Sequence, residues 1–282
     1  MARGPKKWNE ETIARFLKEG RGQGEGANYR PWLGVGDFSS RGRCHRIFGL
    51  KTNRVHHLFS DVEYDLFLLL EWSADVVDIR EQYPLDRDLT MEIAAAHGIR
   101  HPHYPGTHTP AVMTVDFLVT QLRAGQTTYS AFNAKRTEEA EDANSLEKLE
   151  LHRLYWNGLD SPHHLVFHSE TPTVHARNIE WIRGAQLSDG EIERYPGYFN
   201  EYANRMSDEL TRSQRSESLS EYCAKFDIKC GLEAGTGLRV ARLLMQSRVL
   251  MPDLSQPNLY DCPLPAFKVT ARPGNLRLVG GL

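Results

Sequence analysis

The segment MTVDFLV constrains the fold most, because it places a carboxylate inside an apolar run. Asp116 stands in the middle of this run, whose apolar members are Met113, Val115, Phe117, Leu118 and Val119. A short apolar run of this kind is typical of a buried strand. A carboxylate there loses its hydration, so it must be paired with a cation or bind a metal ion. The sequence therefore predicts a sheet protein with a charged site in one of its strands.

Apolar periodicity and turn residues give the order of the elements around this strand. The predicted elements are a helix at 61–72, strands at 76–85, 112–121 and 127–135, a helix at 145–156 and a strand at 163–169. Ser60 or Asp61 is the expected N-cap of the first of these helices. The turn RAGQ predicts a hairpin between the second and third strands. The order of helix, three strands, helix and strand predicts a mixed α/β core, and further helices are expected at 10–18, 90–96 and 174–182.

Two more polar residues stand on the elements next to Asp116. Glu63 lies in the first turn of the predicted helix, and Lys135 ends the strand SAFNAK, two residues after Asn133. Taken alone, Glu63 would be read as a solvated helix residue, since carboxylates are mostly exposed. Two carboxylates and an amine on successive elements are, however, the groups that hold a divalent cation and stabilise a phosphate.

The composition indicates a globular protein with no membrane span. The chain has 282 residues, of which 40% are hydrophobic and 25% are charged, so it suits one large domain or two. The longest apolar run, Leu66 to Leu70, is too short for a bilayer, and MARGPKKW leads into no apolar signal core. Four cysteines without a CxxC pair encode neither a zinc module nor a disulfide framework. We expect a cytoplasmic protein with reduced thiols.

Charge is segregated along the first hundred residues. Residues 1–54 carry 12 Lys and Arg against 5 Asp and Glu, a local +7, whereas residues 55–100 carry 3 against 10, a local −7. Such a basic segment can neutralise backbone phosphates of DNA, although a solvated charged hairpin is the alternative. We expect residues 1–58 to form a basic arm with a DNA-facing hairpin. The candidate DNA-binding residues are Arg43, Arg46, Arg54, His57 and, directly after the lysine, Arg136.

Two other motifs carry less weight. The glycine-rich stretch GRGQGEGANYRPWL lacks GxxxxGK[ST], so it is not a phosphate loop, and we expect irregular DNA-facing or interface backbone there. The loop HGIRHPHYPGTH offers His101, His103 and His108 as zinc ligands. Structural zinc sites usually show tighter paired spacings than this proline-interrupted run, so zinc is the weaker interpretation.

Several segments in order resemble one family of nucleases. GRGQG, YRPWL, RVHHLFSD, LEWSADVVDIREQYPL, HP, TVDFLV, SLEKLELHRLYW and NIEW look like TnsA, the endonuclease subunits of heteromeric transposases. The resemblance covers roughly residues 10–185. It implies a restriction-endonuclease-like (PD-(D/E)xK) core at 59–185 and an Mg²⁺ cofactor, with Mn²⁺ able to substitute.

The resemblance also implies roles for individual residues. Glu63, Asp116 and Lys135 would be catalytic. Asp116, Glu63, the amide oxygen of Asn133 and the backbone carbonyl of Ala134 would be the metal ligands. Families of this kind usually have Gln or Glu two residues before the lysine, and Asn133 offers an amide oxygen on a shorter arm. Glu147 and Glu150 on the next helix suit either a second metal or a solvated face.

The remainder of the chain differs in character. Residues 186–266 contain two apolar helical patterns followed by the strand-like RVLMPDL, which suggests a small winged-helix-like domain for docking proteins or DNA. Residues 267–282 are expected to form a partner-binding tail. The resemblance implies three partners: DNA at transposon ends, a DDE-type transposase subunit (TnsB-like) and an AAA+ ATPase regulator (TnsC-like). It also implies a prokaryotic protein that associates with the nucleoid when active.

The resulting functional hypothesis is cleavage of the non-transferred strand at the 5′ ends of a transposon during cut-and-paste transposition. Two alternatives remain open. A restriction or repair nuclease with the same site would cut alone, which the net charge of −3 disfavours. A scaffold with a decayed site is indicated only by Asn133.

Overall fold

The structure, a computed structural model, describes residues 8–37, 43–137, 143–188, 190–212, 216–270 and 278. The chain divides into two compact units, residues 1–171 and 172–282. The predicted basic arm at 1–58 therefore belongs to the first unit. The division also comes before the predicted boundary at residue 185, because helix α5 (Thr173–Arg183) packs against α8 (Thr236–Gln246) in the second unit.

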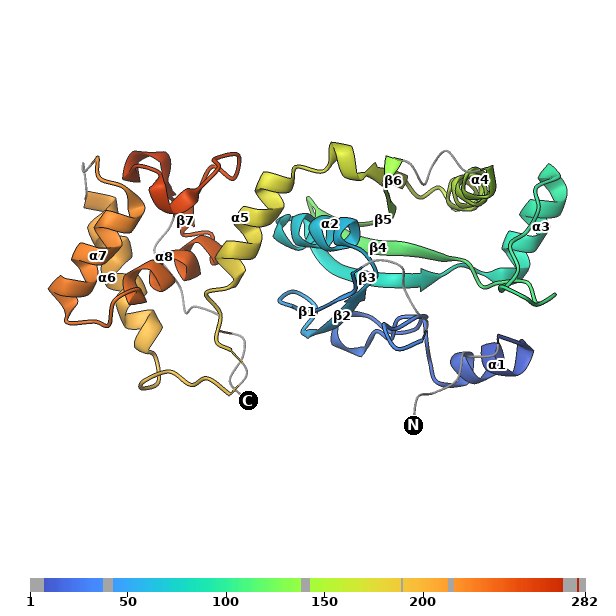
Figure 1. Ribbon diagram of the computed structural model, residues 1–282, viewed down its shortest axis with the longest axis horizontal. Coiled ribbons are helices and arrows are strands. Elements are labelled where there is room, and N and C mark those ends of the chain that lie inside the picture. Colours follow the sequence, from blue (N-terminus) through green and yellow to red (C-terminus); the bar gives the residue numbers. More distant parts are fainter. Residues whose placement is uncertain are drawn as a thin grey trace. The chain divides into compact units, whose positions relative to one another are not determined.

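The predicted mixture of helices and strands is confirmed (Figure 1). The other helices are α1 (Glu10–Lys18), α2 (Asp61–Trp72), α3 (Arg87–His97), α4 (Ala143–Gly158), α6 (Tyr198–Arg212) and α7 (Leu219–Cys230). The strands are β1 (His45–Gly49), β2 (Arg54–Leu58), β3 (Val76–Pro84), β4 (Thr114–Arg123), β5 (Gln126–Lys135), β6 (His163–Phe167), β7 (Leu250–Met251) and β8 (Lys268–Val269).

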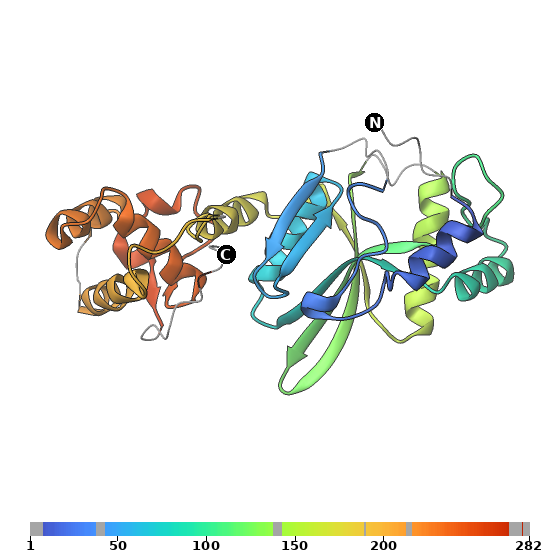
Figure 2. The same ribbon diagram turned by 90° about the horizontal axis from the view of Figure 1, so that it is seen from below.

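A four-stranded sheet in the order β3-β4-β5-β6 is the centre of the first unit. The first three strands are antiparallel, while β6 runs parallel to β5 and is reached through α4. The predicted RAGQ turn is present, with Ala124 and Gly125 both at positive φ, and Figure 2 shows this β4–β5 hairpin projecting from the sheet. Because β4 and β5 are antiparallel neighbours, the start of β4 and the end of β5 lie side by side at the same end of the sheet.

Helices α2 and α4 cover the two faces of this sheet. The rings of Phe117 on β4 and Phe67 on α2 lie 6.5 Å apart, whereas Leu118 joins a buried cluster with Leu151 of α4. Neighbouring residues of a strand point to opposite faces, so the two helices pack on opposite sides. The N-terminus of α2 is capped by Ser60, whose hydroxyl oxygen accepts the N–H of Glu63, as predicted.

The hairpin formed by β1 and β2 is attached to β3 by a buried ionic network. Glu81 on β3 is fully buried, and its carboxylate oxygens accept bonds from both terminal nitrogens of Arg54, at 2.7 and 2.5 Å. His56 Nδ1 lies 2.7 Å from the same carboxylate, and Thr52 Oγ1 lies 2.7 Å from His56 Nε2. Although burial alone would raise it, the pKa of Glu81 is lowered to about 2 by His56 and Arg54. Arg54 and His56 therefore stabilise the buried carboxylate in its charged form.

Arg54→Met should destabilise the fold, because it leaves the buried Glu81 carboxylate without its main partner. We expect a loss of about 3 kcal/mol of unfolding free energy. Arg46→Met on the exposed side of the same hairpin is the matched control, with a change within about 0.5 kcal/mol. Urea unfolding of both variants measures this difference. Equal unfolding free energies of the two variants would show that Arg54 does not stabilise the fold.

The glycine-rich stretch packs along β3, where we expected DNA-facing or interface backbone. Trp32 N–H donates to the carbonyl of Gln82, and the Tyr29 hydroxyl donates to that of Glu81. Gly22 has φ +75°, and a Cβ there would lie 2.2 Å from the ring of Pro84. The glycines therefore permit close packing inside the first unit.

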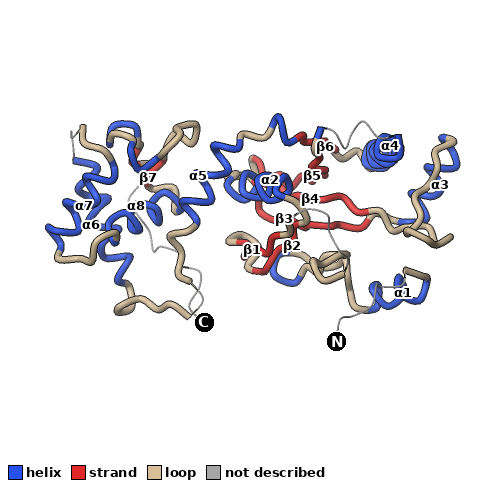
Figure 3. Tube along the Cα trace, in the orientation of Figure 1, coloured by secondary structure: helices blue, strands red, loops and turns tan. Residues whose placement is uncertain are grey.

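The second unit is mostly helical, as predicted (Figure 3). Helices α5, α6 and α7 each pack against α8, whose Val240, Leu243 and Leu244 are buried. Asp227 of α7 accepts the N–H groups of Gly235 and Gly237 at the start of α8. The short strands β7 and β8 pair antiparallel.

The predicted tail at 267–282 is in part structured, because its first residues include β8. Residues 271–277 and 279–282 lie outside the described residues, so the predicted partner binding of the tail stays a prediction. Within the described ranges, no helix is both long and apolar enough to span a bilayer.

Candidate functional site

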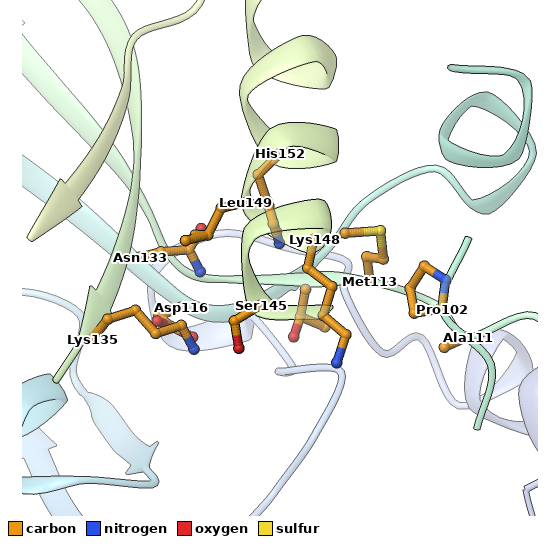
Figure 4. A pocket seen from close by; sticks show the side chains of 11 residues that line it. Pro102, Ala111, Met113, Asp116, Asn133, Lys135, Ser145, Lys148, Leu149 and His152 are labelled. Carbon is orange, nitrogen blue, oxygen red and sulfur yellow. The ribbon is translucent and has the colours of Figure 1, made fainter. Parts of the chain in front are cut away.

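An open pocket of about 290 Å³ lies where the sheet edge meets α4 (Figure 4). Its polar lining comes from Thr114, Asp116, Asn133, Lys135, Ser145, Lys148 and His152. The remaining walls are Pro102, Ala111, Met113 and Leu149. Strand β4 contributes its first residues and β5 its last, because their antiparallel pairing places these ends at one edge.

The carboxylate of Asp116 is held where β4 and β5 separate. Their backbone ladder runs from Arg123 and Gln126 to Phe117 and Phe132 and stops there. One residue further, Asp116 Oδ2 accepts the N–H of Ala134 at 2.8 Å. The side chain thus replaces a backbone acceptor, and this bond orients the carboxylate toward the end of β5.

Glu63 lies close enough to Asp116 and Lys135 for their charges to interact. It is buried in the first turn of α2, where its carboxylate accepts the N–H of Phe59 at 3.0 Å and the hydroxyl of Ser60 at 3.2 Å. Burial, followed by the charge of Asp116, raises the pKa of Glu63 to about 8, and Lys135 opposes this rise. The structure therefore brings together the three residues that the sequence placed on α2, β4 and β5.

Asn133 faces the same pocket but has a partner that the sequence analysis missed. Its side chain is buried, and Oδ1 lies 2.9 Å from Nε2 of His163, the first residue of β6. Ala134 enters the site through its N–H, and the role of its carbonyl stays a prediction. His163 stands thirty positions from Asn133. No local motif links them, and only the parallel pairing of β5 with β6 brings them together.

Helix α4 adds three polar residues to the pocket that were also missed. Ser145, Lys148 and His152 line it, at the spacing of one helical face. Glu147 and Glu150, the candidates for a second metal, do not line the pocket. Glu150 instead binds Arg153 on the exposed side of the helix. A helical projection of residues 145–152 could have identified this face in the sequence.

The predicted DNA-binding residues differ in their exposure to solvent. Arg43, Arg46 and Arg136 are exposed. His57 is half-buried, with Nδ1 accepting the N–H of Val35 at 3.3 Å. The prediction for Arg54 does not fit the structure, because its guanidinium is buried against Glu81 and has no access to a phosphate.

The donor atoms of the pocket suit a hard divalent cation. Among the described residues there is no group of three or more His, Cys, Asp and Glu side chains that could hold a metal, so the zinc interpretation gains no support. Asp116 instead offers carboxylate oxygens in the pocket next to the carboxamide of Asn133. Glu63 lies close enough to Asp116 to add a second carboxylate, and oxygen donors are what Mg²⁺ prefers. Burial, and after it the charge of Asp116, raises the pKa of Glu63, and a bound cation would stabilise both carboxylates together.

Comparison with known proteins identifies the family. A model described as TnsA-like endonuclease N terminal matches residues 73–168, and one described as TnsA endonuclease C terminal matches residues 170–254. The chain is 38% identical over 244 residues to the Transposon Tn7 transposition protein TnsA of Escherichia coli, covering 86% of each chain. The chain belongs to the TnsA family. It is an endonuclease of DNA transposition.

The two TnsA models meet within the boundary region of the structure. The N-terminal model ends at residue 168 and the C-terminal one begins at 170, next to the division between Thr171 and Pro172. Asp116, Asn133 and Lys135 fall inside the N-terminal match, whereas Glu63 precedes it. The assignment of Glu63 to the site therefore depends on its electrostatic contact with Asp116 and Lys135.

Glu63→Gln should change how stability depends on pH in the presence of a chelator. The ordinary pKa of 4.5 rises to about 8 on folding, so the folded protein retains a proton that the unfolded chain loses. The protonated Glu63 carboxyl therefore stabilises the folded protein fully below pH 4.5, and this contribution is lost as the pH rises through 8. Glutamine stays neutral, so the variant should exceed the parent at pH 8 by on the order of 2 kcal/mol.

Thermal melts from pH 5 to 8.5 measure this slope. Glu92→Gln, an exposed carboxylate on α3, is the control and should follow the parent protein. A parent protein whose stability falls with pH no more steeply than that of Glu63→Gln would contradict the raised pKa.

Proposed function

We propose that this endonuclease uses Mg²⁺, or Mn²⁺ in its place, to cleave the non-transferred strand at the 5′ ends of a transposon. The observation that carries the proposal is the convergence of Glu63, Asp116 and Lys135, whose charges interact at one edge of the sheet. Two carboxylates to hold a cation and one amine to meet a phosphate are the groups that phosphodiester hydrolysis requires. The products would carry 5′-phosphate and 3′-hydroxyl ends.

The fold supports the same proposal at a finer level. We infer that the first unit is a restriction-endonuclease-like core, because α2, β3, β4, β5, α4 and β6 follow in that order, with the carboxylate in β4 and the lysine at the end of β5. We infer a winged-helix-like second unit from three helices, α6, α7 and α8, followed by the two-stranded pair β7 and β8.

Each residue of the site would have a separate task in this mechanism. Asp116, Glu63 and the amide of Asn133 would hold the cation, which when bound would supply a water of lowered pKa and neutralise phosphoryl oxygens. Lys135 places an ammonium beside these carboxylates, where it can stabilise charge that develops on a non-bridging oxygen. Lys148 lines the pocket from α4 and supplies a second positive charge to the phosphate. Ser145 can donate its hydroxyl to another phosphate oxygen.

The partners follow from the resemblance and from charge. The relative in Escherichia coli is named as a transposition protein of Tn7. We infer that a DDE-type transposase subunit makes the 3′ cuts and that an AAA+ ATPase regulates the assembly. The net charge of −3 supports sharing of DNA affinity with such partners, because phosphate binding depends on cationic residues. Of the predicted DNA-binding residues, Arg43, Arg46 and Arg136 are exposed and can contribute cations from this chain.

Asp116→Ala should abolish Mg²⁺-dependent nicking, with a loss of at least about 1,000-fold, because it removes a cation ligand and the acceptor for Ala134. Transposon-end DNA labelled on either strand, incubated with the chain and its partners, shows which strand is cut. Asp88→Ala on α3, an exposed carboxylate, is the control with unchanged cutting.

The same assay distinguishes the alternatives. Cutting of unrelated DNA by the isolated chain would favour a restriction or repair nuclease. Cutting that survives Asp116→Ala or excess chelator would refute the proposed site. Absence of cutting with every partner present would favour an assembly subunit without activity.

Lys148→Ala should slow cleavage by about tenfold at saturating DNA, because one of two ammonium groups facing the phosphate is lost. Lys148→Arg keeps the charge and should restore most of the rate. Single-turnover nicking of the assembled complex measures both variants. An alanine variant as fast as the parent protein would remove Lys148 from the mechanism.

A further inference from the structure

The carboxamide of Asn133 is held by a histidine that no motif of the site includes. His163 Nε2 lies 2.9 Å from Asn133 Oδ1. Figure 4 shows the amide nitrogen of Asn133 turned to the side of Asp116. In this arrangement the ring N–H of His163 donates to the amide oxygen.

The histidine itself is held in a fixed plane. The ring of His152 from α4 stacks on that of His163, with centroids 5.6 Å apart and planes inclined by 17°. The stacked rings limit rotation of the His163 imidazole, so its Nε2 stays directed at the carboxamide of Asn133. A neutral imidazole has one donor and one acceptor nitrogen.

A neutral His163 can form a hydrogen bond with Asn133 in two arrangements that place the heavy atoms of both side chains in the same positions. Its Nε2–H can donate to the amide oxygen, or its bare Nε2 can accept from the amide NH₂ once the carboxamide has rotated by half a turn. The first arrangement turns an NH₂ group toward Asp116, which suits a site without a cation. The second turns the amide oxygen toward the pocket, which suits a cation ligand.

We propose that His163 is the positioning residue that lets Asn133 serve the cation site, by exchanging its tautomer as the carboxamide rotates. The inference rests on the proposed function, since it presumes that a divalent cation binds at Asp116. The proton leaves Nε2 and appears on Nδ1 of the same ring through solvent, so the charge of His163 does not change. Partners of this kind around metal ligands fix orientation and contribute strongly to affinity.

The shorter arm of asparagine makes such a partner necessary. Gln or Glu at this position would have one more methylene with which to approach a cation. Asn133 has only two side-chain torsions, and its bond to His163 fixes the carboxamide plane. Pre-orientation of this plane reduces the conformational entropy that ligation would otherwise cost.

His163→Phe tests the proposal, because it preserves the stacked ring and removes the hydrogen bond to Asn133. Mn²⁺ binding to the complete chain, measured by isothermal titration calorimetry, should weaken by about tenfold or more. His164→Phe, the next residue on β6, is the matched control, because His164 is exposed and stacks on Phe132 instead. It should retain the parent affinity within about twofold. His163→Gln, whose amide can accept from Asn133, should recover part of the loss.

A second measurement follows the tautomer of His163 directly and does not depend on a substitution of His163. With ¹⁵N-labelled histidine, NMR identifies which nitrogen of His163 carries the proton in the parent protein. We expect the proton on Nε2 without Mg²⁺ and on Nδ1 with it, and no exchange in Asp116→Ala. The same tautomer in both states, or full Mn²⁺ affinity in His163→Phe, would overturn the role of His163 and leave the proposed function intact. Absence of Asp116-dependent Mn²⁺ binding in the parent protein would overturn both.

Discussion

The bond from the backbone of Ala134 to the carboxylate of Asp116 determines the geometry of the whole site. It forms one residue beyond the point where the β4–β5 ladder ends, so a side chain takes over a task of the backbone. The strands diverge there without leaving Ala134 N–H unsatisfied. The same bond places Asp116 beside Asn133 and Lys135, the alternating residues of β5 that face the pocket. The same hydrogen bond therefore ends the β4–β5 ladder and positions the residues of the site.

Two buried glutamates of the first unit show how partners decide the role of a charge. Glu81 is compensated by Arg54 and His56, which hold its pKa at about 2. Glu63 is buried next to Asp116 instead, and burial followed by the charge of Asp116 raises its pKa to about 8. The first arrangement attaches a hairpin to the sheet and has no capacity left for a ligand. The second holds an excess of negative charge that only a cation or a proton can remove, which is the property of a functional site.

The sequence was sufficient for features that depend on local periodicity. The helix from Asp61 to Trp72 and the strand ending at Lys135 have the predicted limits, because their apolar spacing and caps are properties of neighbouring residues. Contacts between residues far apart in the sequence could not be predicted from it. Nothing near Arg54 in the sequence indicates its buried ion pair with Glu81, so local charge predicts either DNA binding or a solvated surface for the whole basic hairpin. The contact of Asn133 with His163 requires the register of two parallel strands, which no motif encodes.

The crossover from β5 through α4 to β6 brings residues to the pocket that lie outside the set Glu63, Asp116 and Lys135. It carries Lys148 and His152 over the pocket and then returns the chain parallel to β5, so that His163 arrives beside Asn133. A side chain of minimal length at the end of β5 is then supported from the neighbouring strand. Substitution of Asn133 by a longer amide would place its head group beyond the reach of His163. Residue 133 and residue 163 therefore form one unit, and a change at either has to be judged by what it does to the other.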